Sequence, residues 1–263
     1  MNAIQLLLWG WLLAAVIMFL LYLLQRAWQD ASIVDVGWAA NLGILALLYG
    51  LLGDGYGPRQ ALVTAGACLW SFRLSAYLLF NRVIGKEEDG RYQTIRRNKG
   101  DQAQAFFIWF FQVQGALDVL FSLSFLTAAL NPRPGLSVWD YLGLSIILVS
   151  VGGETLADRQ LARFRADPQN KGKTCRAGLW RYSRHPNYFF EWLHWWAYLF
   201  FAVGSLYLWI TLLSPALMLY FLLRVTGIPA TEAQALASRG EDYREYQRTT
   251  SAFIPWFPKE NAK

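Results

Sequence analysis

The segment GLWRYSRHPNYFFEWLHWW, residues 178–196, joins a polar, cationic loop directly to an apolar helix. Pro186 can begin this helix, because the first turn of a helix does not use the N–H group that proline lacks. Asn187 and Glu191 are four residues apart and share one helix face, with Trp195 one turn further along. Because a polar face on an apolar helix costs free energy, we expect this face to bind a ligand.

The composition of the whole chain indicates a protein embedded in a bilayer. Of its 263 residues, 55% are hydrophobic, 16% are aromatic and 16% are charged, whereas soluble domains carry about 25% charged residues. The first apolar run begins almost at Met1 with no basic residue before it, which predicts an anchor rather than a cleaved signal peptide. Cys68 in an apolar run and Cys175 in a basic loop predict no disulfide framework.

Apolar runs long enough to cross about 30 Å of hydrocarbon recur along the chain. They predict an all-α integral membrane protein, a bundle of seven transmembrane helices with cytoplasmic loops and an amphipathic C-terminal tail. We expect a single membrane domain over residues 1–263. The predicted helices lie near residues 4–24, 32–52, 60–80, 105–130, 138–157, 187–203 and 205–223, and the cytoplasmic tail covers 224–263. Only Gly204-Ser205 joins the last two runs, so a re-entrant arrangement of them stays open.

Basic residues alternate between the two sides of this predicted bundle. Of the 24 lysines and arginines, only Arg59, Arg73 and Arg133 fall outside the tail and the loops that follow the first, third and fifth helices. The positive-inside rule therefore predicts an external N-terminus and a cytoplasmic C-terminus.

Polar side chains inside the predicted spans are candidates for function, because they are costly there. Asp35 lies one turn into the second helix, and Gln114 pairs with Asp118 at i, i+4 spacing on the fourth. Each of them alone could equally be a structural hydrogen bond between helices, but most candidates fall in the cytoplasmic half. Further candidates of this kind are Arg73, Asn81, Glu154, Asp158 and Arg165.

Cationic loops on the cytoplasmic side suit a nucleotide, because Arg and Lys form short charge-assisted bonds with phosphate. Ordinary topology and anionic lipids also explain basic loops, but they do not explain the tyrosine, histidine and asparagine residues between the arginines. The chain has no Gly-rich dinucleotide fingerprint and no P-loop, so helices and loops would hold the nucleotide. The loop candidates are Arg82, Arg91, Tyr92, Lys173, Arg181, Tyr182, Arg184, His185 and Tyr188.

Other classes of site lack support in the sequence. His185 and His194 are the only histidines, so we expect no metal site, since a di-iron bundle needs more ligands of this kind. Neither cysteine lies near a plausible base for nucleophilic catalysis. Basic groups next to a membrane also make nucleic acid an unexpected partner, and the oligomeric state stays open.

Several short motifs occur in an order that resembles the bacterial DUF1295 family, over nearly the whole chain. They are Ser32-x-x-Asp35-x-x-Trp38, Glu88-Asp89-Gly90-Arg91-Tyr92, Gly153-Glu154-x-x-Ala157-Asp158, the loop 178–191, Tyr243-x-x-Tyr246 and Phe253-Ile254-Pro255-Trp256. That family is grouped with the steroid 5-alpha-reductase-like membrane enzymes, which have seven helices. They bind NADPH from the cytosol and reduce an activated carbon–carbon double bond in a lipid. The resemblance implies the same activity here, in a bacterial inner membrane.

The resemblance also implies roles for individual residues. Asn187 and Glu191 match a cofactor-binding Asn-x-x-x-Glu. The reductases also have matching residues on their third helix, on their fourth helix and on the helix before the Asn-x-x-x-Glu, which here are Arg73 and Asn81-Arg82, then Gln114-Gly115, then Asp158 and Arg165. Steroid reductases also carry a Gln-Glu pair on the second helix and a Tyr on the third. This chain has no such pair and has Trp70 at the Tyr position, which argues against a steroid enone as the substrate.

The resulting hypothesis is an NADPH-dependent reductase acting on a lipophilic small molecule among membrane lipids. Asp35, or Gln114 with Asp118, would polarise the substrate, and Tyr92 would be a further proton donor. Asp35 could act as a neutral acid in apolar surroundings. An S-adenosylmethionine-dependent lipid methyltransferase stays open, because such enzymes resemble the C-terminal half with its Arg-His-Pro-x-Tyr turn. A non-catalytic lipid-binding protein is the third alternative.

Overall fold

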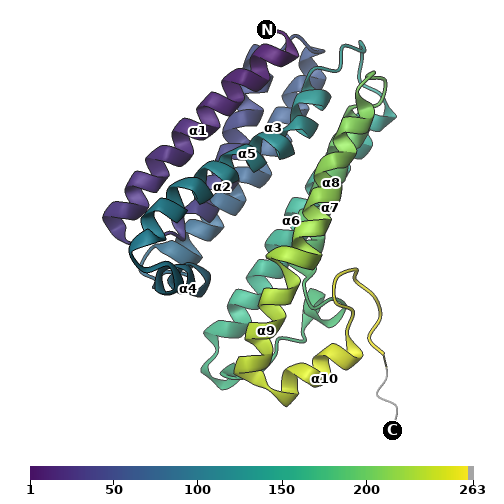
Figure 1. Cartoon of the computed structure of the whole chain (residues 1–263). Helices are drawn as coiled ribbons and strands as arrows, with labels where there is room; N and C mark the ends of the chain where they lie inside the picture. The colour runs from purple at the N-terminus through teal and green to yellow at the C-terminus, as the bar shows by residue number, and fades with distance from the viewer. Residues whose placement is uncertain (260–263) are drawn as a thin grey trace. The chain divides into compact units, whose positions relative to one another are not determined.

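The computed structural model describes residues 1–259, and every regular element in that part of the chain is helical (Figure 1). Six helical segments among these residues are long and apolar enough to cross a membrane. The prediction of an all-α membrane protein is therefore confirmed for the described residues. The count of seven crossings stays a prediction.

The helices of the first half agree closely with the apolar runs of the sequence. A π turn, Leu79–Val83, extends the third long helix. A short 3-10 turn, Gly100–Gln102, leads into the fourth long helix. One additional short helix, α4, lies in the basic loop where no span was predicted. The helices are α1 (Ala3–Trp28), α2 (Ile33–Leu52), α3 (Gly57–Leu78), α4 (Gly90–Lys99) and α5 (Ala103–Ala129).

The second half departs more from the predicted boundaries. α6 (Val138–Ala166) continues well past residue 157, because the charged residues that end the apolar run are compatible with a helix in water. α7 (Pro186–Phe201) has 16 residues, short of the length of a full crossing. The run predicted at 205–223 is divided into a 3-10 turn, the helix α8 (Leu213–Tyr220) and a π turn. The tail forms α9 (Ile228–Arg239) and α10 (Glu241–Thr249).

The chain divides into two compact units, and the division falls within α6, α7 and α8. The first unit is Met1–Tyr141 with Tyr198–Ser214, and the second is Leu142–Ala197 with Pro215–Lys263. The prediction of a single membrane domain stays a prediction.

In the first unit α2 and α5 are the two central helices, since they contact each other and each contacts α1 and α3. Two glycines of α2 allow its close approach to α3. A Cβ on Gly43 would lie 2.6 Å from Ser71 Oγ, and a Cβ on Gly50 would lie 2.0 Å from Thr64 Oγ1. Small residues at such a seam are the usual means by which helices pack inside a membrane.

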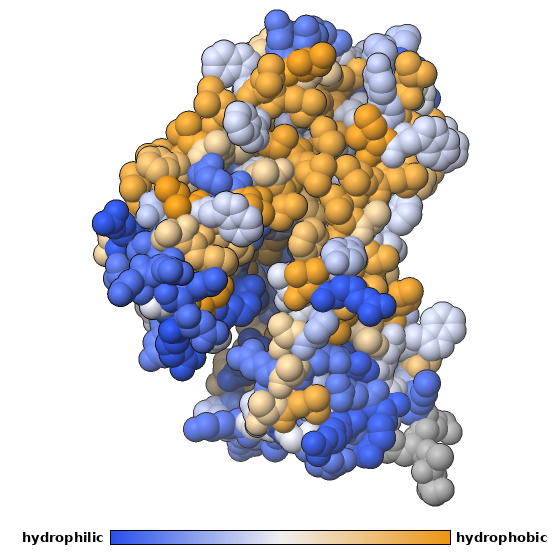
Figure 2. Space-filling view, in the orientation of Figure 1, coloured by the Kyte–Doolittle hydropathy of each residue, from blue (hydrophilic) through white to orange (hydrophobic). Residues whose placement is uncertain are grey.

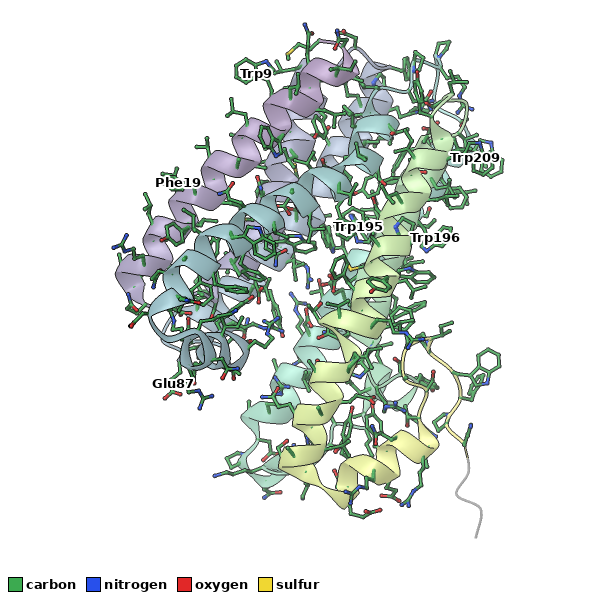
Figure 3. The ribbon with its side chains drawn as sticks, viewed as in Figure 1. Trp9, Phe19, Glu87, Trp195, Trp196 and Trp209 are labelled. Atoms are coloured by element: carbon green, nitrogen blue, oxygen red, sulfur yellow. The ribbon has the colours of Figure 1, made fainter. Side chains whose placement is uncertain are left out.

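The outer face of α1 is apolar and exposed in the first unit. Trp9 and Phe19 point away from the neighbouring helices (Figure 3), with 56% and 43% of their surfaces exposed. In Figure 2, hydrophobic residues cover the long helices of this unit and hydrophilic residues gather over α4. This distribution fits long helices in lipid and α4 in water.

A buried ion pair closes the end of the first unit where α3 begins. Arg59 Nε donates to Asp140 Oδ1 at 2.5 Å, and neither side chain is exposed. The terminal nitrogens of Arg59 donate to the backbone oxygens of Arg133 and Gly135, both at 2.7 Å. The turn 131–135 thus accepts the remaining hydrogen bonds of a buried arginine.

In the second unit α6 and α7 are in close contact. A Cβ on Gly153 would lie 2.4 Å from the ring of Phe190, so only glycine fits at this position without a shift of the ring. Next to this contact, the indole of Trp180 donates to the backbone oxygen of Ala157 at 2.9 Å. α9 and α10 pack against each other through Ala235, Tyr243 and Tyr246.

Candidate functional site

A charged cluster in the first unit joins two motifs that are far apart in the sequence. Asp35, near the start of α2, accepts hydrogen bonds from Arg91 Nη2 and from the Tyr92 hydroxyl, both at 2.7 Å. Arg82, in the π turn after α3, lies 3.7 Å from the same carboxylate. The structure thus brings together four of the residues predicted for the site: Asp35, Arg82, Arg91 and Tyr92.

The local sequence explains why α4 lies against the start of α2. Asp89 caps α4 by accepting from the Arg91 backbone N–H at 2.9 Å, and its own N–H donates to Ser32 Oγ at 2.9 Å. Glu88 accepts from the Ala31 backbone N–H at 2.7 Å. Burial would raise the pKa of Asp89, but its hydrogen bonds with Arg91 outweigh this and keep its pKa below the usual value. Asp89 therefore holds α4 as a carboxylate.

The contacts of this cluster bear on the role expected for Asp35. Its two oxygens each accept a short hydrogen bond, one from a guanidinium and one from a tyrosine hydroxyl, so both are engaged as acceptors. Tyr92 is buried and directs its proton at Asp35, whereas the side chains of Arg82 and Arg91 are 42% and 38% exposed. The accessible edge of the cluster is therefore cationic.

The other candidates of the first unit lie on α3 and α5. Arg73 is half-buried, with its guanidinium carbon 6.0 Å from the Tyr77 ring centre. Asn81 is exposed and donates to the Tyr77 backbone oxygen at 2.8 Å. Gln114 is half-buried on α5, one turn before the buried Asp118.

Asp118 has a partner that the sequence reasoning missed. Its Oδ2 accepts a hydrogen bond from Asn41 Nδ2 at 2.7 Å, and both side chains are fully buried. The predicted pairing of Asp118 with Gln114 is along one helix, whereas the hydrogen bond runs across from α2 to α5. The signal that could have identified Asn41 is its polar side chain in the middle of an apolar run.

In the second unit, the residues predicted on α6 and α7 face one another. Asn187 Nδ2 donates to Asp158 Oδ1 at 3.4 Å, and Asp158 is only 4% exposed. Glu154, one turn earlier on α6, is buried as well, and Glu191 is half-buried on α7. Two helices therefore present acids and an amide to the same short stretch of this unit.

Arg184 and His185 fasten their loop to the tail. Arg184 Nε donates to Glu232 Oε1 at 2.6 Å, and its Nη1 donates to the backbone oxygens of Gln247 and Thr250 at 3.1 and 2.6 Å. His185 Nε2 lies 3.3 Å from the same Glu232 oxygen. Burial lowers the pKa of His185, and Glu232 offsets only part of this effect. The sequence reasoning missed Glu232 as the partner of this loop.

Two further loop candidates are engaged in the same region. Tyr188 stacks on His185 with ring centres 5.4 Å apart, and its hydroxyl lies 3.2 Å from Thr231 Oγ1. The backbone oxygen of Tyr182 accepts from the Trp256 N–H at 2.9 Å, and its ring is partly exposed. Burial raises the pKa of Tyr243 to about 12, so the hydroxyl that it directs at Glu232, 3.5 Å away, stays protonated at neutral pH.

The remaining basic candidates of the second unit are exposed. Arg165 and Lys173 line an open pocket of about 570 Å³ between the end of α6, the loop 167–175 and the end of α9. Lys171 and Arg239 line it too, so four cations and one acid, Asp167, are among its lining residues. Arg181 is exposed and lies outside this pocket.

The helices and these polar clusters define an all-helical membrane protein with a charged end in each unit. The family described as "Protein of unknown function (DUF1295)" matches residues 21–250, and the chain belongs to this family. An uncharacterized protein of Schizosaccharomyces pombe is 28% identical over an alignment of 204 residues, and the match covers 67% of this chain and 59% of the yeast protein. The match thus leaves part of that relative's length uncovered. No solved structure matches the chain.

Proposed function

We propose that this protein is an NADPH-dependent membrane oxidoreductase that reduces an activated carbon–carbon double bond in a lipid-like substrate. The observation that carries the proposal is the hydrogen bond between Asn187 and Asp158, 3.4 Å long. These two residues lie on different helices, α7 and α6. Both match positions that bind the cofactor in the steroid 5-alpha-reductase-like enzymes.

A stripe on α6 leads from this pair into the cationic pocket. Asp158, Leu161 and Arg165 are three and four residues apart and therefore share one helix face. Leu161 and Arg165 line the pocket of about 570 Å³. Seven residues of helix advance by about 10 Å, so one extended ligand could meet the Asp158–Asn187 pair and the pocket together.

The residues of the second unit fit the chemistry of NADPH. Arg165 and Lys173 would hold phosphate, since both are exposed cations on the pocket wall. Asp158 and Asn187 would take up ribose hydroxyl or amide groups. When bound, NADPH supplies a hydride to one alkene carbon while a proton reaches the other, which leaves NADP⁺ and the saturated product.

In the first unit, the residues proposed to act on the substrate are Asp35 with Tyr92, or Gln114 with Asp118. Asp35 would orient Arg91 and Tyr92 by accepting a hydrogen bond from each of them. The Asn41–Asp118 pair lies deep between apolar helices. Asp118 is fully buried, whereas the Asp35 side chain is 19% exposed, so Asp35 is the more accessible of the two acids.

We also propose the topology that the basic residues indicate. The chain would cross a bacterial inner membrane seven times, with the N-terminus outside and the tail in the cytoplasm. α7 would be the crossing not counted among the six, shortened to 16 residues. Labelling single cysteines introduced at exposed positions 54 and 241 from either side of sealed vesicles would test this orientation.

The experiment that tests the function is a ligand-dependent thermal shift of the purified protein. NADPH should raise the unfolding midpoint, and Asn187→Ala should abolish the shift. Arg165→Ala should reduce the thermal shift caused by NADPH more than the shift caused by NADH. Arg163 is an exposed residue of the same helix outside the pocket, so Arg163→Ala should leave both thermal shifts unchanged. A shift with S-adenosylmethionine alone would instead favour the methyltransferase, and a shift with neither would favour a lipid-binding protein.

A further inference from the structure

The C-terminal segment 253–259 forms an exposed aromatic surface on the second unit that the proposed reaction does not use. Ile254, Trp256 and Phe257 are 58%, 69% and 76% exposed. A pocket of about 370 Å³ lies beside them, with Arg248 and Lys259 among its lining residues. Large apolar side chains next to exposed cations are unusual on a surface in water. They indicate a partner that has an apolar part and an anionic part.

Backbone hydrogen bonds fix this segment to the loop that precedes α7. The Arg184 N–H donates to the Ser251 oxygen at 2.8 Å, and the Trp256 N–H donates to the Tyr182 oxygen at 2.9 Å. Ser183 Oγ donates to the Phe253 oxygen at 2.8 Å. The segment therefore lies beside the chain just before Pro186, where the apolar helix begins.

The segment 253–259 lies where the helices of the second unit change from apolar to polar sequence. On α7 the apolar sequence begins after Pro186, and on α6 charged residues become frequent from Asp158 onward, with Glu154 one turn earlier. Asp158 and Asn187 are in contact, so both antiparallel helices change from apolar to polar at one level. Phe253 packs on the first turns of α7, with its ring centre 5.9 Å from that of Phe189 and 5.6 Å from that of Trp192.

We propose that the pocket beside Trp256 and Phe257 binds the headgroup of an anionic phospholipid from the leaflet that α7 enters. Arg248 and Lys259 would contact the lipid phosphate, with the hydroxyls of Thr249 and Ser251 nearby on the pocket wall. Ile254, Trp256 and Phe257 would lie among the upper acyl carbons, as aromatic residues do at membrane interfaces. Lipid binding would thereby hold the loop Tyr182–Arg184 at the membrane surface.

The test uses the full chain in detergent with phosphatidylglycerol added in steps, and native mass spectrometry counts the lipids retained. Each cation near an anionic lipid contributes a factor of about five in affinity. Arg248→Ala with Lys259→Ala should therefore weaken phosphatidylglycerol binding by roughly 25-fold. The matched control is Arg244→Ala with Lys171→Ala, which removes the same charge from the same unit. Arg244 resembles Arg248 closely, with 65% against 67% exposure and an ion pair to Glu241 at 3.3 Å in each case.

A second measurement locates the aromatic residues. The difference in fluorescence between the parent protein and Trp256→Phe isolates the contribution of Trp256. In nanodiscs with brominated acyl chains this Trp256 component should be strongly quenched, which would place Trp256 in the bilayer. Quenching of that component by aqueous iodide alone would overturn the proposal. Equal lipid retention by the two double variants would also overturn it. A thermal shift with inorganic phosphate in lipid-free detergent, lost in Arg248→Ala with Lys259→Ala, would assign the pocket to a soluble anion instead.

These outcomes are separate from those of the proposed reductase. Neither Arg248 nor Trp256 belongs to the Asp158–Asn187 pair or to the pocket lined by Arg165. NADPH could therefore fail to bind while the lipid site is verified, or the reverse.

Discussion

Two charge clusters lie at opposite ends of the α2–α3 pair, about 30 Å apart by the length of α2. At one end Arg59 and Asp140 are fully buried, and the arginine also donates to backbone oxygens of a turn. At the other end Asp35 is held by Arg91 and Tyr92, but the arginine is 38% exposed. The first cluster is closed and leaves no surface for a ligand, whereas the second has an accessible cationic edge. The difference indicates a structural role for the first and a binding or catalytic role for the second.

The largest effect should follow from breaking the closed cluster. Asp140→Asn leaves the Arg59 charge buried without its carboxylate, so we expect a loss of about 3–5 kcal/mol in the free energy of unfolding. Asp54→Asn is the control, since Asp54 is 80% exposed and pairs with the terminal amino group at 2.9 Å. That surface pair should contribute less than about 1 kcal/mol. Thermal unfolding in detergent would measure both.

A rescue would sharpen this prediction. Replacing both partners together, Arg59→Met with Asp140→Leu, should recover much of the loss, because no buried charge then remains without a partner. If Asp140→Asn unfolded at the same temperature as Asp54→Asn, the closed cluster would have no structural role and the contrast between the two ends would fail.

The open cluster should affect turnover more than folding. Asp35→Asn removes the charge that orients Arg91 and Tyr92, and we expect NADPH oxidation in the presence of a lipid extract to fall about 100-fold. NADPH-dependent thermal shifts should stay unchanged. Asp101→Asn, an exposed acid in the 3-10 turn before α5, is the matched control. Full turnover in Asp35→Asn would remove Asp35 from the reaction.

A third cluster, in the second unit, is intermediate between these two. Arg184 and Glu232 are 10% and 15% exposed, and their carboxylate–guanidinium bond of 2.6 Å fastens the loop before α7 to α9. Glu232→Gln weakens hydrogen bonds to a charged group, so we expect a loss of about 1.5–3 kcal/mol. Hydrogen exchange should become faster at the backbone N–H groups of Arg184 and His185. Glu241→Gln, 65% exposed on α10, should leave exchange at both positions as it is.

Features that depend on local sequence could be predicted, whereas features that depend on contacts between residues far apart in the chain could not. Apolar runs are local and long, so α1, α2, α3 and α5 were predicted within a few residues. The end of α6 was not, because hydropathy reports where a helix leaves the membrane and not where it stops. The short helix α4 escaped prediction since its docking depends on Ser32 and Ala31, more than fifty residues away.

The candidate site shows the same limit. Asp158 and Asn187 were assigned through a resemblance, and the structure adds that they are hydrogen-bonded. Asn41 and Glu232 were missed as partners, because a single sequence shows which residues are polar but not which pairs meet across helices. Arg184 and His185 are predicted to bind a cofactor, and the structure adds that both contact Glu232.

The smallest effect expected is a pH dependence that originates at His185. This side chain is 3% exposed, and burial lowers its pKa in the folded protein despite the carboxylate of Glu232. The unfolded chain therefore binds a proton at higher pH than the folded one does, so stability should decrease as the pH falls through about 6.5. Arg184, also close to the ring, adds to this effect by disfavouring a second positive charge.

His185→Gln removes the titrating group while keeping a polar side chain beside Glu232. Its unfolding midpoint should change less than that of the parent protein between pH 7.5 and about 5.5. Acids elsewhere in the chain titrate equally in both proteins, so the difference between the two pH profiles isolates His185. A profile that fell equally steeply in His185→Gln would place the pH-sensitive group outside the Arg184–Glu232 cluster. The loop before α7 would then be fastened by charges that do not change near neutral pH.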